Sequence, residues 1–354
     1  MISLGKETPG LKRLIPLVFP LLLLSSCKSA GDSAQIATRS EGEILKIAFG
    51  SCNDTERGNR LWDDVLALGP DLWIWGGDNV YADTDDMEEL REYYAELKAV
   101  PGYKALETTT PVIGTWDDHD YGLNDGGAEF KARAASQQVF LDFLGVPEKS
   151  SRREREGVYA AHNYSTGKGS VKVLVLDTRY FRTQLKEDPA GNRRYVPHTE
   201  PGGTILGEAQ WAWLERELNE SGADFNILVS SIQVLSGEHG FETWGNFPDE
   251  VARLKQVIAD SGARGVIVFS GDRHISEFSR TDSQPLSYPL VDFTSSGLTH
   301  AYRAFKGEPN PFRTGEVISV ESFGWVTLDI SNRRATFQIR GDGNKVLLEL
   351  SQTY

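Results

Sequence analysis

The chain has 354 residues, of which 39% are hydrophobic and 25% are charged. This composition is typical of a globular protein with a substantial buried core, and it excludes an intrinsically disordered chain. The formal net charge of −14 argues against a nucleic-acid partner, because proteins that bind DNA or RNA gather Lys and Arg on one face. The short basic clusters at 150–157 and 191–195 are interpreted as solvated loops.

The first residues have the pattern of a targeting signal. Three basic residues precede the apolar run LIPLVFPLLLL, which is too short for a membrane span of roughly 20 residues. The ending LSSC resembles a bacterial lipoprotein signal, in which the cysteine becomes the lipidated first residue; an ordinary secretory signal with an incidental cysteine is the alternative. We therefore expect a signal peptide at 1–26, a polar tether at 27–43, and an exported lipoprotein, periplasmic or on the cell surface, anchored to a membrane at Cys27.

From Ile44 onward, apolar runs of strand type alternate with segments of helical periodicity. Strands are predicted at 44–50, 71–78, 111–115, 158–165, 171–179, 226–234, 265–274, 290–297, 324–331 and 335–350, the last with a turn at 340–345. Helices are predicted at 60–68, 87–100, 129–145, 209–221 and 251–262. This order indicates a single domain from 44 to 354 with an α/β core of mixed sheets, two of them packed face to face between helices.

Five predicted strands end in a glycine or another small residue that is followed by a candidate ligand. These exits are Phe49–Cys52, Trp75–Tyr81, Gly114–Asp120, Val175–Arg179 and Phe269–His274. A single Asp after a strand is more often a turn or cap residue, but five such exits favour a ligand site at the strand ends. The third exit opens the run TWDDHDYGLNDG, whose bunched carboxylates are unfavourable unless a cation lies among them.

The motifs GSC, GDNVY, TWDDHD, LDTR and SGDRH, in this order and spacing, resemble the PhoD-like (alkaline phosphatase D type) branch of the calcineurin-like metallophosphoesterases. The resemblance runs from about Ile44 nearly to the C-terminus. It implies a four-layer α/β/β/α sandwich of two mixed sheets with two or three metals at the sheet edge. It also implies an exported enzyme that hydrolyses phosphate monoesters, often diesters, and uses Fe(III) together with Ca²⁺, although other divalent metals are possible.

The resemblance assigns the metal ligands residue by residue. Asp78 would bridge the metals, the iron would take the thiolate, phenolate and imidazole, and the calcium would take the remaining carboxylates. The metal ligands implied in this way are Cys52, Asp78, Tyr81, Asp118, Asp272 and His274. Cys52 is one of only two cysteines in the chain, and ligation explains why an exported protein would keep it unpaired.

His119 is the implied catalytic residue, which stabilises the transition state or protonates the leaving group while a metal-activated hydroxide attacks phosphorus in line. Asn124 and Arg179 are candidate contacts to phosphate oxygens. Gln233 or His239 would reach the second metal, with a plain loop role as the alternative. His300 is expected at the pocket rim.

The chain departs from the founding members of that branch in two ways. They carry a β-rich domain ahead of the catalytic part, and their acidic run ends in paired asparagines, whereas this one ends in GLNDGG. Both departures leave the natural substrate, a small-molecule monoester or diester, open, and the oligomeric state is open too. The alternative function is a non-catalytic, metal-stabilised lipoprotein that binds a phosphorylated or glycan ligand; His119 argues against it, because a binder needs no proton donor.

Overall fold

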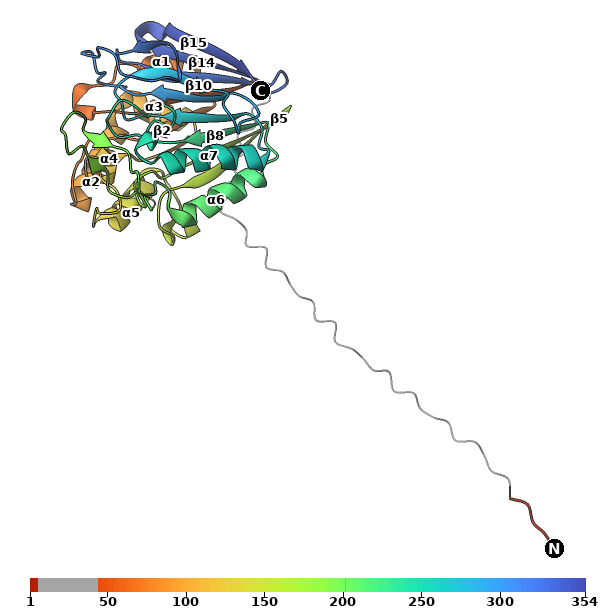
Figure 1. Ribbon diagram of the computed structural model, residues 1–354. Coiled ribbons are helices and arrows are strands. Elements are labelled where there is room, and N and C mark those ends of the chain that lie inside the picture. Colours follow the sequence, from red (N-terminus) through yellow and green to blue (C-terminus); the bar gives the residue numbers. More distant parts are fainter. Residues whose placement is uncertain (6–43, 201) are drawn as a thin grey trace. The chain divides into compact units, whose positions relative to one another are not determined.

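The computed structural model describes residues 1–5, 44–200 and 202–354. The predicted tether, Cys27 and all but the first five residues of the predicted signal peptide lie outside the described residues. Every described helix and strand belongs to one compact unit that extends to Tyr354 (Figure 1). No helix in the described ranges combines the length and apolar composition needed to cross a membrane.

The first large sheet has six strands in the order β15–β14–β13–β1–β2–β3. Neighbours β1, β2 and β3 run parallel, while β13, β14 and β15 are antiparallel additions on the other side of β1. The strands are β1 Ile44–Gly50, β2 Leu72–Gly76, β3 Val112–Thr115, β13 Phe323–Asp329, β14 Arg334–Gly341 and β15 Lys345–Thr353.

The second large sheet has seven strands in the order β12–β10–β11–β9–β8–β5–β4, with β5, β8, β9 and β11 parallel. Its strands are β4 Ala160–Thr166, β5 Gly169–Val175, β8 Phe225–Val229, β9 Val266–Ser270, β10 Ser276–Thr281, β11 Leu290–Ser295 and β12 Arg313–Ile318. A separate two-stranded hairpin consists of β6 Lys186–Glu187 and β7 Tyr195–Val196.

The two large sheets pack face to face through alternate, fully buried side chains of their inner strands. Phe49 of β1 stacks on Phe269 of β9, with ring centroids 4.4 Å apart, and meets Phe293 of β11 edge-on at 4.9 Å. Such aromatic pairs add specific geometry to the burial of apolar area. They fix the end of β1 against the ends of β9 and β11, which are the strands that carry several of the predicted ligands.

Helices cover the outer face of each sheet. On the first sheet, the buried Trp73 and Trp75 of β2 pack against Trp62 and Tyr103 from the covering helices. The helices α6 and α7 bury the outer face of the second sheet in the same way. The helices are α1 Trp62–Leu68, α2 Met87–Ala99, α3 Pro101–Thr109, α4 Asp118–Tyr121, α5 Arg133–Phe143, α6 Gly207–Asn219 and α7 Pro248–Ser261. Short 3₁₀ turns are η1 Thr55–Arg57, η2 Ser151–Arg153, η3 Trp244–Asn246 and η4 Asp342–Asn344. The predicted four-layer α/β/β/α sandwich is therefore confirmed.

Some elements differ from the prediction. The helix α3, which begins with a proline at its first position, and the strands β10 and β12, which are rich in polar residues, were not predicted from apolar periodicity. The run after β3 was expected to be an exit loop, but its residues Asp118–Tyr121 form one helical turn. The backbone N–H of Asp117 donates to Asp120 Oδ1 at 2.7 Å, which closes this turn at its start.

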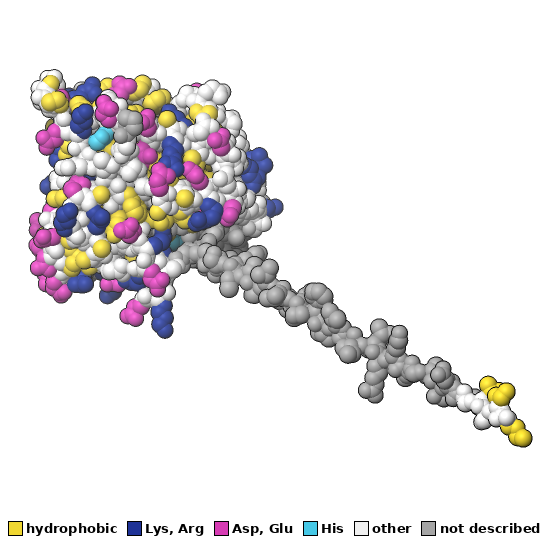
Figure 2. All heavy atoms as spheres, turned by 60° about the horizontal axis from the view of Figure 1, so that its bottom comes forward, with side chains coloured by type: hydrophobic (Ala, Val, Ile, Leu, Met, Phe, Trp, Pro, Cys, Tyr) yellow, Lys and Arg dark blue, Asp and Glu magenta, His cyan; other side chains and the backbone are white. Residues whose placement is uncertain are grey.

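The parallel strands of both sheets end at one common edge. The backbone N–H of Cys52, after β1, donates to the carbonyl of Gly77, after β2. Across the sheets, the Thr115 hydroxyl donates to the Leu176 carbonyl at 2.7 Å. On the face in Figure 2, acidic and basic side chains of the described residues are interspersed and form no continuous basic stripe.

Candidate metal centre

Four of the six predicted ligands adopt a left-handed backbone just beyond the strand ends. The φ angles are 58° at Cys52, 50° at Asp78, 66° at Asp272 and 54° at His274. A positive φ is uncommon outside glycine, and such conformations cost on the order of 1–3 kcal/mol each. Strain of this kind persists where the surrounding structure enforces it, and it is concentrated here at one edge of the sandwich.

The ligands predicted for iron lie together. The Cys52 sulfur is 3.4 Å from Asp78 Oδ2, and the Tyr81 hydroxyl donates to the same carboxylate oxygen at 3.3 Å. The Tyr81 oxygen is also 3.3 Å from His274 Nε2. Ligand atoms of Cys52, Asp78 and His274 all lie within 4.8 Å of one another, which is close enough for one ion to contact all three.

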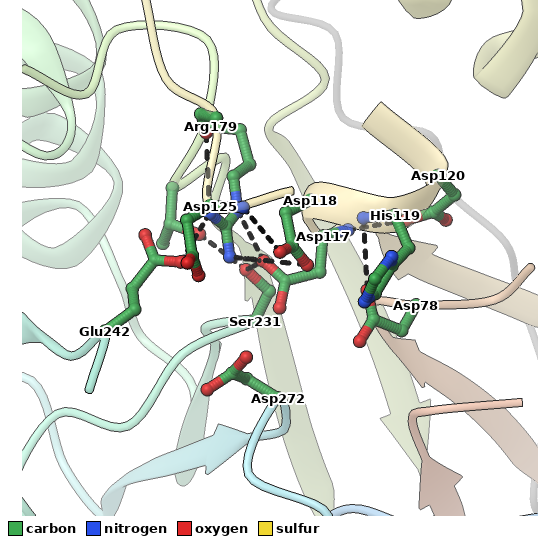
Figure 3. A network of polar contacts seen from close by, with 12 residues as sticks. Asp78, Asp117, Asp118, His119, Asp120, Asp125, Arg179, Ser231, Glu242 and Asp272 are labelled. Atoms are coloured by element: carbon green, nitrogen blue, oxygen red, sulfur yellow. Dashed lines mark hydrogen bonds and ion pairs between the residues drawn. The ribbon is translucent and has the colours of Figure 1, made fainter. Parts of the chain in front are cut away.

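The carboxylates predicted for the second metal adjoin this group. Asp78, Asp118 and His119 form one cluster with ligand atoms within 4.8 Å of one another, and Asp117, Asp118 and Asp272 form another. Figure 3 shows Asp272 facing Asp117 and Asp118 across a gap, with Asp78 and His119 on one side. Because Asp78 and Asp118 are shared between clusters, the six predicted ligands and His119 form one continuous set.

Arg179 is the main internal counter-charge of this set. Its side chain is completely buried, forms an ion pair with Asp117, and lies 2.6 Å from Glu242 Oε2 and 3.9 Å from Asp118 Oδ1. Burial raises the pKa of Asp118. The charges of Arg179 and His119 and the hydrogen bond from the Asp125 N–H outweigh burial, and together they lower the pKa to about 2. Asp118 is therefore ionised across the physiological range.

The other carboxylates lack enough positive charge. Burial and the neighbouring Cys52 and Asp118 raise the pKa of Asp78 well above its ordinary value, and burial likewise raises the pKa of Asp272. Asp118 Oδ1 and Asp117 Oδ2 are buried and accept no hydrogen bond from the described residues. Buried carboxylate oxygens that accept no hydrogen bond and lie beside like charges are the environment that a bound cation stabilises, so the donor set fits metal ions.

Cys52 is buried and unpaired, and its surroundings favour the thiolate. Burial raises the pKa of the thiol, but His274 and hydrogen bonds from Ser296 and Ser51 lower it to about 6. Ser296 Oγ is 3.0 Å from the sulfur. Burial, together with Cys52 and Asp78, raises the pKa of Tyr81 well above its usual value, so a phenolate there needs a bound cation.

His119 is held by a single carboxylate outside the ligand set. Its Nδ1 lies 2.8 Å from Asp83 Oδ2, and no described residue makes a hydrogen bond to Nε2. Burial lowers the pKa of His119, but the hydrogen bond to Asp83 and the nearby Asp118 carboxylate outweigh burial and raise the pKa to about 9. The ring is thus protonated at neutral pH and packs 4.2 Å from the Tyr81 ring.

Several predicted contacts are not supported by the geometry. Arg179 was expected to bind phosphate oxygens, but its guanidinium is shielded from solvent and bound by Asp117 and Glu242. Gln233 is buried, and its amide donates to Glu277 and Thr294 at 2.9 and 2.8 Å. Its amide nitrogen therefore serves contacts within the second sheet.

The remaining predicted residues lie at the periphery. His239 is buried, its Nδ1 accepts the Phe241 backbone N–H at 3.2 Å, and it belongs to none of the ligand clusters among the described residues. Asn124 is exposed in the loop after α4. The ring of His300 lies 4.4 Å from the ring of His274 and 5.1 Å from that of Tyr81.

Sequence reasoning missed a set of residues that surround Asp118. Asp125 donates its backbone N–H to Asp118 Oδ2 at 2.7 Å, and its own carboxylate accepts the Tyr195 hydroxyl at 2.7 Å and pairs with Arg194. Glu242 lies within 4.8 Å of both Asp118 and Asp125. Asp125 lies in the acidic run TWDDHDYGLNDG, but the pair of arginines in GNRRY was interpreted as a solvated loop, so the contact between the two segments was missed.

The chain is similar to known proteins in sequence and in fold. A family model described as PhoD-like phosphatase matches residues 47–337. Alkaline phosphatase D of Bacillus subtilis (strain 168) is 24% identical over 304 residues, covering 72% of this chain and 51% of that protein. The chain thus spans about half the length of this curated relative.

Three solved structures share the fold. The structure of PhoD matches with a TM-score of 0.70 and 19% identity, over 89% of this chain and 69% of that chain. GAP50, described as the anchor in the inner membrane complex of Plasmodium, matches with a TM-score of 0.53 and 12% identity, over 88% of this chain and 89% of that chain. A dimetal phosphatase from Danio rerio matches with a TM-score of 0.51 and 14% identity, over 88% of this chain and 99% of that chain.

The burial of Arg179 leads to a stability prediction. Arg179→Gln leaves Asp117 buried without its cation, while Glu242 keeps only Arg182, so we expect the free energy of unfolding to fall by about 3–5 kcal/mol. The exposed pair Arg91–Glu88 provides the matched control, and Arg91→Gln should cost less than about 1 kcal/mol. Denaturant titration monitored by circular dichroism measures both, and equal losses would contradict the assignment.

Proposed function

The chain belongs to the PhoD-like phosphatase family, and on this basis we propose that it is a metal-dependent phosphoester hydrolase acting on monoesters, diesters or both. The observation that supports the proposal most directly is the convergence of thiol, phenol, imidazole and carboxylate donors around Asp78. Export and lipid anchoring at Cys27 are proposed on the sequence pattern alone.

The donor types support two kinds of metal. Cys52, Tyr81 and His274 would hold Fe(III), because thiolate and phenolate are suited to iron. Asp118 and Asp272 would hold Ca²⁺, which prefers oxygen ligands. The same carboxylates also suit other divalent ions. When bound, such metals activate water and neutralise charge on phosphoryl oxygens. Asp78 would be shared, since its carboxylate belongs to both ligand clusters.

His119 is proposed as the proton donor to the leaving-group oxygen. Its Nδ1 is fixed by Asp83, so the ring presents Nε2 on the side away from that carboxylate. The backbone N–H of His119 also donates to Asp78 Oδ1 at 3.4 Å, which holds the imidazole at a fixed place relative to the bridging carboxylate. A donor held in this way supports catalysis more than simple ligand capture.

Arg194 is proposed to bind the substrate phosphate, in place of the buried Arg179. About half of its side chain is exposed, and it pairs with Asp125 at the corner beside Asp118. Asp125 would keep the Tyr195 hydroxyl as a partner when Arg194 turns to a phosphate oxygen. The planar guanidinium offers the paired donors that a phosphate accepts best.

Replacing the shared carboxylate tests the proposed function. Asp78→Asn should lower the hydrolysis of para-nitrophenyl phosphate and of its bis-ester by about a hundredfold or more, while circular dichroism shows an intact fold. Asp63→Asn, an exposed change on α1, is the control and should leave turnover unchanged. Undiminished activity of Asp78→Asn would place the reaction elsewhere, and metal binding without turnover by the unaltered protein would favour the alternative of a binding module.

The ligands proposed for iron lead to a spectroscopic prediction. The iron-loaded protein should show a visible charge-transfer band from thiolate and phenolate, which chelation removes and Tyr81→Phe weakens or shifts. Tyr93→Phe on α2 is the matched control and should leave the band unchanged. A fully active, colourless preparation would remove iron from the proposal.

The proposed phosphate contact has a kinetic signature. Arg194→Gln should raise KM for para-nitrophenyl phosphate about tenfold with little change in kcat, because a charge-assisted hydrogen bond to substrate is lost. Arg193→Gln removes the neighbouring charge from the same loop and should leave both constants unchanged. If the two variants behave alike, Arg194 does not contact the substrate.

A further inference from the structure

A cavity of about 380 Å³ lies beside the candidate metal centre, and neither the proposed metals nor the proposed phosphate contact uses it. Its rim carries the basic side chains Arg57, Arg60, Arg303 and Lys345. We call it the basic pocket. Its volume is within the range of pockets that hold small organic molecules.

The basic pocket opens at the same edge of the sandwich as the metal centre. Arg57 and Arg60 lie in the loop that follows β1, a few residues beyond Cys52. Phe49 of β1 pairs with Gly324 of β13, so β13 begins at the edge where β1 ends. Because β14 is antiparallel to β13, its end and the start of β15 at Lys345 return to this same edge.

Thr299 connects the basic pocket to the metal centre. It lines the pocket, and its hydroxyl donates to the Cys52 carbonyl at 3.2 Å and accepts the Asp54 N–H at 2.9 Å. Its neighbour His300 packs against His274, with ring centroids 4.4 Å apart. One residue therefore separates the pocket wall from the rings that surround the proposed iron position.

The charges of the basic pocket are only partly compensated. Of its four lining cations, Arg303 pairs with Glu321 and Arg57 pairs with Asp54, and Asp342 is the remaining lining carboxylate. Arg60 and Lys345 form no ion pair within the described ranges of the chain. Arg60 and Lys345 outnumber the one unpaired lining carboxylate, Asp342, and on a protein whose net charge is −14 this local excess of positive charge favours a negatively charged ligand.

The basic pocket also has an apolar side. Leu61 and Leu298 lie at its base and are almost fully buried, while Leu347 lines it further out. Val320 lines it as well and is 39% exposed, so an apolar side chain is accessible in the pocket. A ligand that fills this space therefore needs an apolar body as well as a charge.

We propose that the basic pocket binds the part of the substrate beyond the scissile phosphoester, and that this part is an organic group with its own negative charge. The inference rests on the proposed function and adds a substrate class to it: phosphoesters whose alcohol carries a carboxylate or a second phosphate on a partly apolar body. The scissile phosphoryl group lies at the metals, and the second charge meets Arg60 and Lys345.

A pair of substrates that differ by one charge tests this inference. The metal-loaded full chain should hydrolyse para-carboxyphenyl phosphate with a kcat/KM about five to tenfold higher than for phenyl phosphate, after correction for the leaving-group pKa. The double variant Arg60→Gln/Lys345→Gln should lose this preference while its kcat/KM for phenyl phosphate stays unchanged. Lys46→Gln/Arg334→Gln removes the same charge at the opposite ends of β1 and β14 and should keep the preference.

A binding measurement separates failure of this inference from failure of the proposed function. Calorimetry with para-hydroxybenzoate, the product that would occupy the basic pocket, needs no turnover. Binding by the unaltered chain and the control variant, with loss in Arg60→Gln/Lys345→Gln, supports the pocket even if no phosphoester is hydrolysed. Absence of binding to the unaltered chain, or a substrate preference that survives in the double variant, overturns the inference.

Discussion

More carboxylates meet at one edge of this sandwich than the protein's own cations can neutralise. Arg179 holds Asp117 and Glu242 and keeps Asp118 ionised, yet the pKa of Asp78 and that of Asp272 remain well above their ordinary values. The fold therefore carries an electrostatic deficit that bound metal ions would relieve. This excess of negative charge accounts for the clustered ligand geometry, the buried thiol and the positively charged histidine as parts of one cation site.

Backbone strain and core packing hold these negatively charged side chains close together. The left-handed conformations at Cys52, Asp78, Asp272 and His274 turn their side chains toward a common point, which ordinary backbone would not do. The packing of the two sheets across Phe49 and its aromatic neighbours holds the strand ends in register, so that these turns cannot relax independently. Stability contributed by the core thus maintains an arrangement that is unfavourable by itself.

Much of the fold, and the convergence of the strand exits at one edge, could be predicted from sequence because both depend on local signals, whereas the proposed ligand set came from the family resemblance of the exit motifs. Buried strands show as apolar runs, and the small residues that follow them mark the exits where Cys52 and Asp78 lie. What could not be predicted depends on contacts between distant segments. Arg179 follows a strand just as a substrate ligand would, and nothing local reveals that Glu242, 63 residues away, neutralises it. Asp125 and Arg194 are also far apart in the sequence, so nothing local indicated their ion pair, and Arg194 was interpreted as part of a solvated loop.

The small hairpin of β6 and β7 stands apart from both large sheets and is attached near Gly240 by backbone bonds from Arg194 and Tyr195. Its tip can therefore change in length or composition without disturbing a strand of the core or a ligand of the cluster. Because this segment carries Arg194, the proposed phosphate contact, its divergence would change substrate binding and leave the ligand cluster in place. A few replacements in one peripheral loop could in this way change the substrates of the protein during evolution.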